Sequence, residues 1–400
     1  MSTDMTMQPI KRALAPRLVT ALEDTPAVMV VGPRQAGKST LVKELIAGDA
    51  DARYLTLDDL GNLEAARRDP VGFVESRAGT VAIDEVQRAP ELLLPIKAAI
   101  DVDRRPGRFI LTGSAQVMLL PTVSESLAGR IEVHTLWPFS QAEIAGVDPR
   151  GVPALLEQGT RPPTAPPTGR EEMIERLARG GFPEAVSRPD DRRAEWLDAY
   201  LSAIVQRDLR DLANIERLAE IPVLLASLAA RVRAPLNKAD VGSSVGIPRS
   251  SLDRYLTLLE HVFLVRRLPA WHSNRIKQIT KAPKLLIADS ALLMHLLRAD
   301  RTRLERDDAL LGTVLECFVG MELAKQIAAT SPRTALMHMR TARGVEVDFV
   351  LEGTGGEIAG LEVKAAATVR ADDFKHLVRL RDSLGDRLEA WPLACLWTAV

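Results

Sequence analysis

A phosphate-binding loop pattern constrains this chain more than any other feature. The apolar run Val28–Val31 ends at Gly32, and Gly37, Lys38 and Ser39 follow four residues later. This is G-x-x-x-x-G-K-S/T placed after a buried strand and before a segment with helical spacing, which is the setting that the pattern requires. The glycines let successive backbone N–H groups face a phosphate, and the helix N-terminus adds the positive end of its dipole. The sequence therefore predicts an α/β nucleotide-binding domain.

The side chains of this loop suggest ATP and Mg²⁺ as cofactors. Lys38 can reach the β- and γ-phosphates, and the Ser39 hydroxyl can bind Mg²⁺. Thr40 is the weaker candidate for the metal, because the pattern places the metal-binding hydroxyl directly after the lysine. The residues expected to contact the nucleotide are Gly32, Pro33, Arg34, Gln35, Ala36, Gly37, Lys38, Ser39 and Thr40.

A pair of adjacent carboxylates follows a second short apolar run. Residues 80–83 lead into Asp84 and Glu85, and ligands collect at the carboxyl ends of strands in parallel α/β sheets. We expect Asp84 to hold Mg²⁺, through water, and Glu85 to polarise the attacking water, so that Glu85 and Lys38 are catalytic. One carboxylate alone could cap a strand end, whereas two after a phosphate loop favour a nucleotide site.

Further polar residues are candidates for the same site. The apolar strand that begins at Arg108 ends in Thr112 and Ser114, and one of these hydroxyls would sense the γ-phosphate. A turn with Ser114 as a helix cap is the alternative. Arg130 follows a glycine and is a third catalytic candidate, because arginine neutralises charge that develops on a transferring phosphoryl group. An ordinary surface ion pair is the alternative for Arg130.

Five stretches of the chain occur in a fixed order. They are Gly-Pro-Arg-Gln-Ala-Gly-Lys-Ser, Ile-Asp-Glu-Val-Gln, Leu-Thr-Gly-Ser, Leu-Ala-Gly-Arg and Leu-Trp-Pro-Phe-Ser-Gln-Ala-Glu. Together they resemble a bacterial and archaeal group of AAA+-type ATPases, whose members commonly carry a C-terminal domain of uncharacterised function. The resemblance covers most of residues 10–145. It implies an AAA+-like P-loop ATPase core with a parallel sheet.

The middle of the chain is expected to be helical. Prolines crowd residues 148–170, so we interpret this stretch as a linker that no helix continues. Residues 171–275 show a short helix, a glycine turn and a second helix near Ser250, which is typical of a winged-helix-like module. Arg249 and Arg254 of the second helix could contact DNA, but such modules also serve as plain interaction domains.

The C-terminal part holds a second candidate site. Two alternating segments bring Asp348, Glu362 and Lys364 onto neighbouring strands, and Glu316 lies on a preceding helix. Two carboxylates that hold a divalent metal beside a lysine are suited to phosphodiester hydrolysis. Asp followed at a distance by Glu-x-Lys resembles the restriction-endonuclease-like, or PD-(D/E)xK, family. A solvated strand face is the alternative, and Val347 stands where that family has proline.

These observations predict three folded parts and one linker. They are an AAA+-like domain at 1–147, a linker at 148–170, a helical and winged-helix-like region at 171–275, and a mixed α/β restriction-endonuclease-like domain at 276–400.

Composition limits the environment and the partners. The net charge of −1 gives no global electrostatic case for nucleic acid, so any DNA contact needs a local patch. Two distant cysteines and the lack of a membrane-spanning run indicate a cytoplasmic protein with no membrane partner. A homo-oligomer with arginines acting across subunits is an open alternative.

We expect Mg²⁺-dependent ATP hydrolysis that drives a DNA- or protein-directed activity, or else a nucleotide-gated scaffold with a non-cutting nuclease-like domain.

Overall fold

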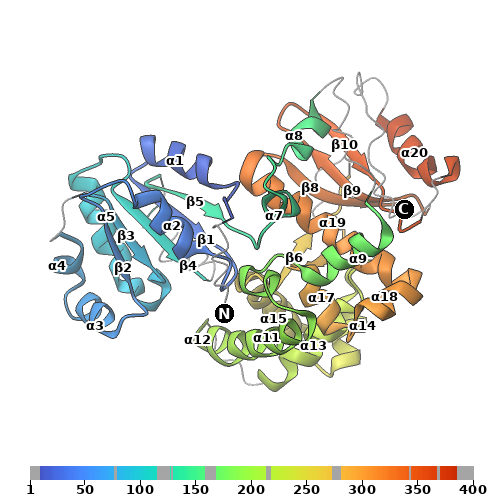
Figure 1. Cartoon of the computed structure of the whole chain (residues 1–400), viewed down its shortest axis with the longest axis horizontal. Coiled ribbons are helices and arrows are strands. Elements are labelled where there is room, and N and C mark those ends of the chain that lie inside the picture. Colours follow the sequence, from blue (N-terminus) through green and yellow to red (C-terminus); the bar gives the residue numbers. More distant parts are fainter. Residues whose placement is uncertain are drawn as a thin grey trace, which may run out of the picture.

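The computed structural model describes residues 10–75, 79–114, 127, 129–157, 168–212, 218–272, 281–341, 344–366 and 370–384. Its elements form two lobes: the N-terminal part of the chain makes one, and the helices and small sheets that follow make the other (Figure 1). Within this described part of the chain, no helix combines the length and apolar character needed to cross a bilayer.

A parallel sheet forms the centre of the N-terminal lobe. Its five strands stand in the order β2-β3-β4-β1-β5, and every pairing between them is parallel. The strands are β1 (Ala27–Val31), β2 (Arg53–Thr56), β3 (Val81–Asp84), β4 (Phe109–Gly113) and β5 (Ile131–Thr135). This confirms the α/β parallel sheet expected from the sequence.

Helices cover both faces of this sheet, because successive side chains of a strand point to opposite faces. Val28 and Val30 of β1 join an apolar cluster with α1 and α2, whereas Met29 and Val31 join the larger core with α3, α4 and α5. The helical elements of this lobe are α1 (Ala15–Asp24), α2 (Lys38–Ile46), α3 (Leu60–Arg68), α4 (Pro70–Glu75), η1 (Val86–Arg88), η2 (Pro90–Leu92) and α5 (Leu93–Val102).

A run of helices begins the second lobe. The helix-turn-helix order expected in the middle region is present: α14 starts at its cap Asn237 and ends at Gly246, whose φ of 75° is the left-handed geometry that ends many helices. The winged-helix identity of this region stays a prediction. The elements are α7 (Gln141–Ala145), α8 (Gly151–Leu156), α9 (Arg170–Arg179), α10 (Pro183–Val186), α11 (Asp190–Ala203), the π-helical turn η4 (Ile204–Asp208), α12 (Leu209–Leu212), η5 (Leu218–Glu220), α13 (Ile221–Ala229), α14 (Lys238–Val245) and α15 (Arg249–His261).

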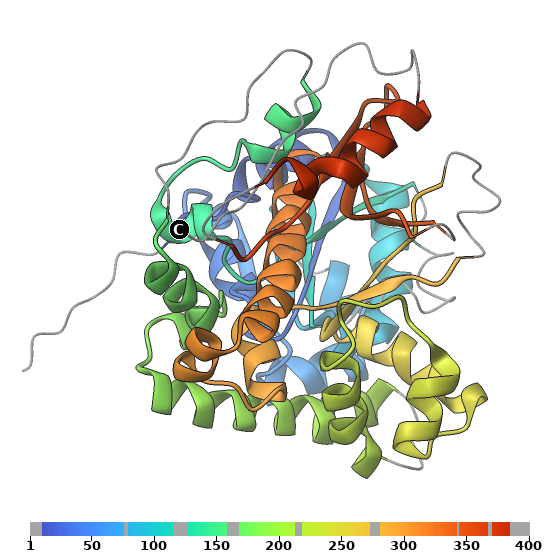
Figure 2. The same cartoon turned by 90° about the vertical axis from the view of Figure 1, so that its right-hand side faces the viewer.

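The long helix α19 organises the rest of this lobe. Figure 2 shows it in orange, passing through the middle of the lobe with the C-terminal sheet and α20 in red near one end. The sheet is antiparallel, in the order β10-β9-β8, and the hairpin expected between its last two strands is present. The elements are β6 (Val265–Leu268), β7 (Lys284–Ile287), α17 (Ser290–Leu296), α18 (Arg301–Arg306), α19 (Asp308–Thr330), β8 (Ala335–Arg340), β9 (Glu346–Glu352), β10 (Ile358–Leu361), η6 (Ala371–Phe374) and α20 (Lys375–Leu384).

The proline-rich stretch at 148–170 is not wholly a linker. Residues 151–156 form helix α8, although we expected no helix here. Pro153 is compatible with this helix because it stands in the first turn, where its missing N–H costs nothing. The Val152 N–H donates to Gln326 Oε1 of α19 at 3.2 Å, so α8 packs on the second lobe. Residues 158–167 lie outside the described part of the chain.

The expected boundary between residues 275 and 276 falls between paired strands. β6 precedes it and β7 follows it, and the two pair antiparallel, with Val265 opposite Ile287. The helical middle and the C-terminal part therefore share one core rather than meeting at an exposed linker.

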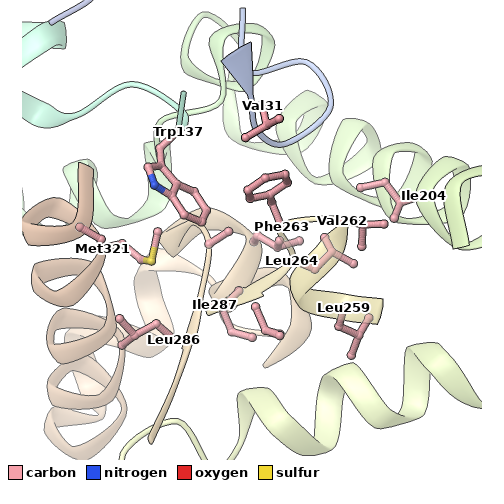
Figure 3. Close-up of a cluster of buried hydrophobic side chains, with 14 of the residues drawn as sticks. Val31, Trp137, Ile204, Leu259, Val262, Phe263, Leu264, Leu286, Ile287 and Met321 are labelled. Carbon is pink, nitrogen blue, oxygen red and sulfur yellow. The ribbon is translucent and has the colours of Figure 1, made fainter. Parts of the chain in front are cut away.

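One apolar cluster joins the two lobes. Figure 3 shows Val31, at the end of β1, in the same cluster as Phe263, Trp137 and Ile204. Phe263 and Trp137 meet edge to face, with ring centroids 5.5 Å apart. The backbone φ of Phe263 is 58°, a left-handed conformation that is uncommon for a bulky residue and persists only where packing holds it. The start of the phosphate loop therefore rests on residues of the second lobe.

We predict that Phe263→Ala strongly destabilises the protein. Removing a fully buried phenylalanine ring costs about 3–5 kcal/mol, and here the loss falls on the contact between the lobes. The midpoint of urea denaturation should drop clearly. Val223→Ala, at a side chain on α13 that is 56% exposed, is the matched control and should change the midpoint little. Equal effects of the two substitutions would contradict the importance of this cluster.

Candidate functional site

The backbone of the phosphate loop is bent at its two glycines. Gly32 has a φ of 156°, and a Cβ placed on it would lie 2.0 Å from the carbonyl oxygen of Leu136. Gly37 has a φ of 93° and is the N-cap of α2. Any side chain at Gly32 would collide with backbone, and one at Gly37 would be strained. The loop therefore wraps around the N-terminus of α2, as the sequence pattern requires.

Lys38 lies folded back over this loop. Its side chain is only 4% exposed, and its Nζ donates to the carbonyl oxygens of Gly32 at 3.0 Å and Pro33 at 2.9 Å. Burial lowers the pKa of Lys38, while the nearby carboxylates of Glu85 and Asp84 raise it. Hydrogen bonds from an ammonium group to phosphate are stronger than those to neutral carbonyls, so Lys38 is placed to exchange these partners for a nucleotide.

The Ser39 hydroxyl meets the first residue of the acidic pair. Its Oγ donates to Asp84, 3.0 Å from each carboxylate oxygen. Thr112 also donates to Asp84, and the Tyr54 hydroxyl does so at 2.7 Å. Burial and this hydrogen bond raise the pKa of Tyr54. Mg²⁺ commonly binds through one or two protein oxygens together with water and phosphate oxygens, so Ser39 and Asp84 could hold it.

Glu85 is held beside Asp84 in a left-handed conformation, with a φ of 61°. Its Oε2 accepts hydrogen bonds from Gln87 and, at 3.2 Å, from Ser114. The Glu85 N–H donates to the Thr112 hydroxyl at 3.0 Å. Thr112 thus contacts both acids, because β4 stands between the loop strand β1 and the acid strand β3. Gln87 links Glu85 to Ser114 by donating a hydrogen bond to each.

Arg34 of the loop has a partner from the other lobe. Its Nη1 donates to Asp208 Oδ1 at 2.8 Å, and the neighbouring Arg207 approaches Asp58 at 3.6 Å. Burial raises the pKa of Asp208, the Arg34 charge lowers it, and the Glu85 charge raises it. The carboxylate of Asp208 is thus the group of this segment that contacts the phosphate loop.

Arg12 links the phosphate loop to the segment that follows β5. It is buried, and it donates to the carbonyl oxygens of Ala36 and Trp137, both at 2.6 Å. Its Nε also pairs with Glu143 at 3.0 Å. No local signal marks this role, because the three partners lie 24, 125 and 131 positions away.

Arg130 lies away from this site in its own chain, so its role in neutralising charge on the phosphoryl group stays a prediction. β5 runs parallel to β1, with Ile131 opposite Ala27 and Thr135 opposite Val31. Arg130 therefore lies at the edge where these strands begin, about 15 Å from the edge where the loop starts. Its Nε pairs with Asp101 at 2.6 Å, which is the alternative that the sequence left open.

The four residues of the second candidate site lie near one another. The Val363 N–H donates to Asp348 Oδ2 at 2.8 Å, and Lys364 Nζ donates to Glu362 Oε1 at 3.1 Å. Burial and the Glu362 charge raise the pKa of Asp348 to about 6. Burial and the Asp348 charge likewise raise the pKa of Glu316. The Val363 contact places Asp348 next to Glu362, and one buried lysine contacts both Glu316 and Asp348, so the three acids form one cluster.

A second lysine, which no sequence pattern indicated, belongs to this cluster. Lys284 of β7 is 1% exposed, and its Nζ lies 2.9 Å from Glu316 Oε1, 3.0 Å from Glu346 Oε1 and 3.9 Å from Asp348 Oδ1. Burial opposes its charge, but the neighbouring carboxylates outweigh burial and raise the pKa of Lys284. In the described ranges, no group of three or more His, Cys, Asp or Glu side chains is arranged to hold a metal ion.

Three protein families match consecutive parts of the chain. Residues 24–145 match an AAA domain, residues 170–303 a domain of unknown function (DUF8612), and residues 311–393 another domain of unknown function (DUF4143). The AAA match agrees with the loop geometry and with the parallel sheet. It identifies the N-terminal lobe as an ATP-binding ATPase domain.

Two solved structures are among the similar folds. The Walker-type ATPase PABY2304 of Pyrococcus abyssi has a TM-score of 0.42 and 16% identity, over 72% of this chain and 98% of that one. A single-substitution variant of RuvB from Thermotoga maritima has a TM-score of 0.31 and 18% identity, over 67% of this chain and 94% of that one.

Two sequence relatives are the uncharacterized proteins Rv2008c of Mycobacterium tuberculosis and Mb2031c of Mycobacterium bovis. Each is 32% identical over 361 residues, which is 90% of this chain and 74% of the relative. The chain therefore belongs to the same family as these two mycobacterial proteins and carries its AAA domain at residues 24–145.

Proposed function

We propose that this protein is a Mg²⁺-dependent ATPase that uses the site between the phosphate loop and the acidic pair to drive or gate an activity of the second lobe. The observation that carries the proposal is the contact of the Ser39 hydroxyl with Asp84 at 3.0 Å. A hydroxyl and a carboxylate that meet beside a buried lysine can share a magnesium ion whose other ligands are phosphate oxygens and water.

Each residue has a definite part in this proposal. Lys38 leaves the Gly32 and Pro33 carbonyls and binds the β- and γ-phosphates. Ser39 and Asp84 hold the metal, which supplies charge neutralisation on the phosphoryl oxygens. Glu85 orients the attacking water and accepts its proton, and the hydrogen bonds from Gln87 and Ser114 fix the direction of its carboxylate.

The partner of the second lobe is DNA or a protein. The exposed side of α15 offers Arg249 and Arg254, but the Asp253 carboxylate lies between them and pairs with Lys238. This mixed charge supports a local contact rather than a broad basic surface. The ATP hydrolysis rate with and without added DNA would separate the two classes of partner, since only a DNA-directed enzyme should be stimulated.

The position of Lys284 favours a second candidate function, a nucleotide-gated scaffold whose nuclease-like domain does not cut. The ammonium of Lys284 lies among Glu316, Glu346 and Asp348. A catalytic metal would need these carboxylate oxygens, and a like charge at their centre repels it. The cluster therefore carries its own cation.

We predict that Lys38→Ala abolishes ATP binding and that Glu85→Gln keeps binding and loses turnover by a factor of about 10² or more. The reason is that Lys38 contacts the ground-state phosphates, whereas Glu85 acts on the water. Calorimetric titration with ATP and Mg²⁺ and a phosphate-release assay measure the two effects. Lys97→Ala on α5 is the matched lysine control. Hydrolysis by Lys38→Ala at the wild-type rate would refute the site.

We predict that linear or circular DNA incubated with the protein and Mg²⁺ or Mn²⁺ stays intact, and that it is retarded in a gel if DNA is the partner. The reason is the internal ammonium of Lys284. Cleavage that disappears in both Glu362→Ala and Lys364→Ala would instead establish an ATPase–nuclease.

We predict that Asp348→Asn gains stability relative to the wild type as the pH rises. The folded wild type keeps the Asp348 proton up to a pKa of about 6, above the ordinary value of 3.8. The free energy of unfolding of the wild type therefore falls as the pH rises from about 4 to about 6, by roughly 2–3 kcal/mol at most. The Asp348→Asn variant lacks this loss. Urea midpoints at pH 4 and pH 7 test it. An unchanged difference between the two proteins would show that Asp348 does not titrate in this range.

A further inference from the structure

We infer that Asp208 competes with the nucleotide for Arg34, so that ATP binding releases the phosphate loop from the second lobe. This inference rests on the proposed ATP site and names its regulation. It assigns Arg34 two alternative partners: a carboxylate of the other lobe when the loop is free, and a phosphate oxygen when the loop is occupied.

The geometry joins the loop directly to the second lobe. Arg34 stands two positions after Gly32 and four before Lys38, so it belongs to the phosphate loop itself. Its ion pair with Asp208 is 2.8 Å long, with side-chain exposures of 23% and 11%. A pair that is mostly shielded from solvent is screened less than a surface pair, and it bridges 174 positions of sequence.

The charges around the pair would favour an exchange. The charges of Glu85, Asp84, Arg34 and Asp208 all influence the pKa of Lys38. The negative charge of Glu85 also raises the pKa of Asp208. Asp208 contacts Arg34 of the phosphate loop at 2.8 Å, and it therefore lies next to the loop that would hold the triphosphate. Added phosphate charge attracts Arg34 and repels Asp208, and a planar guanidinium binds phosphate oxygens as readily as carboxylate oxygens. Both effects favour phosphate over Asp208 as the partner of Arg34.

The Asp208 carboxylate lies on an element whose geometry can change when the ion pair with Arg34 is lost. Asp208 is the last residue of the π-helical turn η4, which interrupts the helix between α11 and α12. Single π-helical turns are rare and are frequently found at functional sites. Ile204, at the other end of this turn, packs in the apolar cluster that contains Phe263 (Figure 3). Loss of the Arg34 contact would thus free a turn that packs next to the end of α15.

A second ion pair between the lobes does not oppose such a release. Arg207 approaches Asp58 at 3.6 Å, with both side chains about half exposed. A pair with that exposure contributes little stability, so it can guide η4 without opposing its movement. The apolar cluster between the lobes consists of hydrophobic side chains such as Val31 and Phe263, which a nucleotide would not displace.

The experiment measures ATP affinity in Asp208→Asn, a substitution that keeps the side-chain shape and removes the competing charge. We expect the dissociation constant for ATP with Mg²⁺ to fall by about three- to tenfold, because Arg34 no longer has to leave a charged partner. The gain in ATP affinity from Asp208→Asn should vanish when Arg34 is also replaced by alanine, because Asp208 then has no arginine to hold. Asp198→Asn, at an exposed acid of α11 that pairs with His295, is the matched control and should leave affinity unchanged.

A second measurement follows the opening of η4 and α12 rather than ATP affinity. Hydrogen exchange of the amides at 204–212 should become faster in the wild type when ATP and Mg²⁺ are added, and it should already be fast in Asp208→Asn without ATP. Wild-type affinity or weaker binding in Asp208→Asn, or exchange at 204–212 that ATP does not change, would overturn the inference. The ATP site itself would stand as long as Lys38→Ala abolishes binding. Failure of the wild type to bind ATP would instead refute the proposed function.

Discussion

The hydrogen bond from Ser39 to Asp84 is the contact on which the rest of the site depends. It joins the N-terminus of α2 to the end of β3. The strand that leads into α2 is β1, and it is not a neighbour of β3 in the sheet because β4 stands between them. Thr112 of β4 fills this space and contacts both acids. Three strand ends therefore supply one polar surface, and the parallel order of the sheet is what brings them to the same edge.

Buried charges tie this edge to the second lobe. Arg34 and Asp208 come from different lobes, and so do Arg12 and Glu143, whose side chains are both almost fully buried. A buried charge that loses its partner is costly, commonly by about 3–5 kcal/mol. The two lobes therefore do not behave as independent domains on a flexible linker. Their relative position is set in part by these ion pairs.

The sequence predicted what depends on neighbouring residues and missed what depends on distant ones. The phosphate loop, the acidic pair and Thr112 follow from strand ends and loop spacing alone. The position of Arg130 could not be predicted, because a Gly-Arg pair does not reveal at which edge of the sheet it lies. The partner of Arg34 lies 174 positions away, and one partner of Lys284 lies 32 positions away. No local sequence pattern therefore predicts either pair.

The two charged sites are connected by continuous packing. The loop strand ends at Val31 in the cluster that holds Phe263, and Phe263 comes two residues before β6. β6 pairs with β7, where Leu268 stands opposite Lys284, the lysine at the centre of the acidic cluster. Close-packed interiors compress little and transmit displacement. The packing of η4 against this cluster therefore links the ATP site to Lys284 through hydrogen-bonded strands. That connection gives a physical reason for joining an ATPase lobe to a domain whose carboxylates already hold an internal cation.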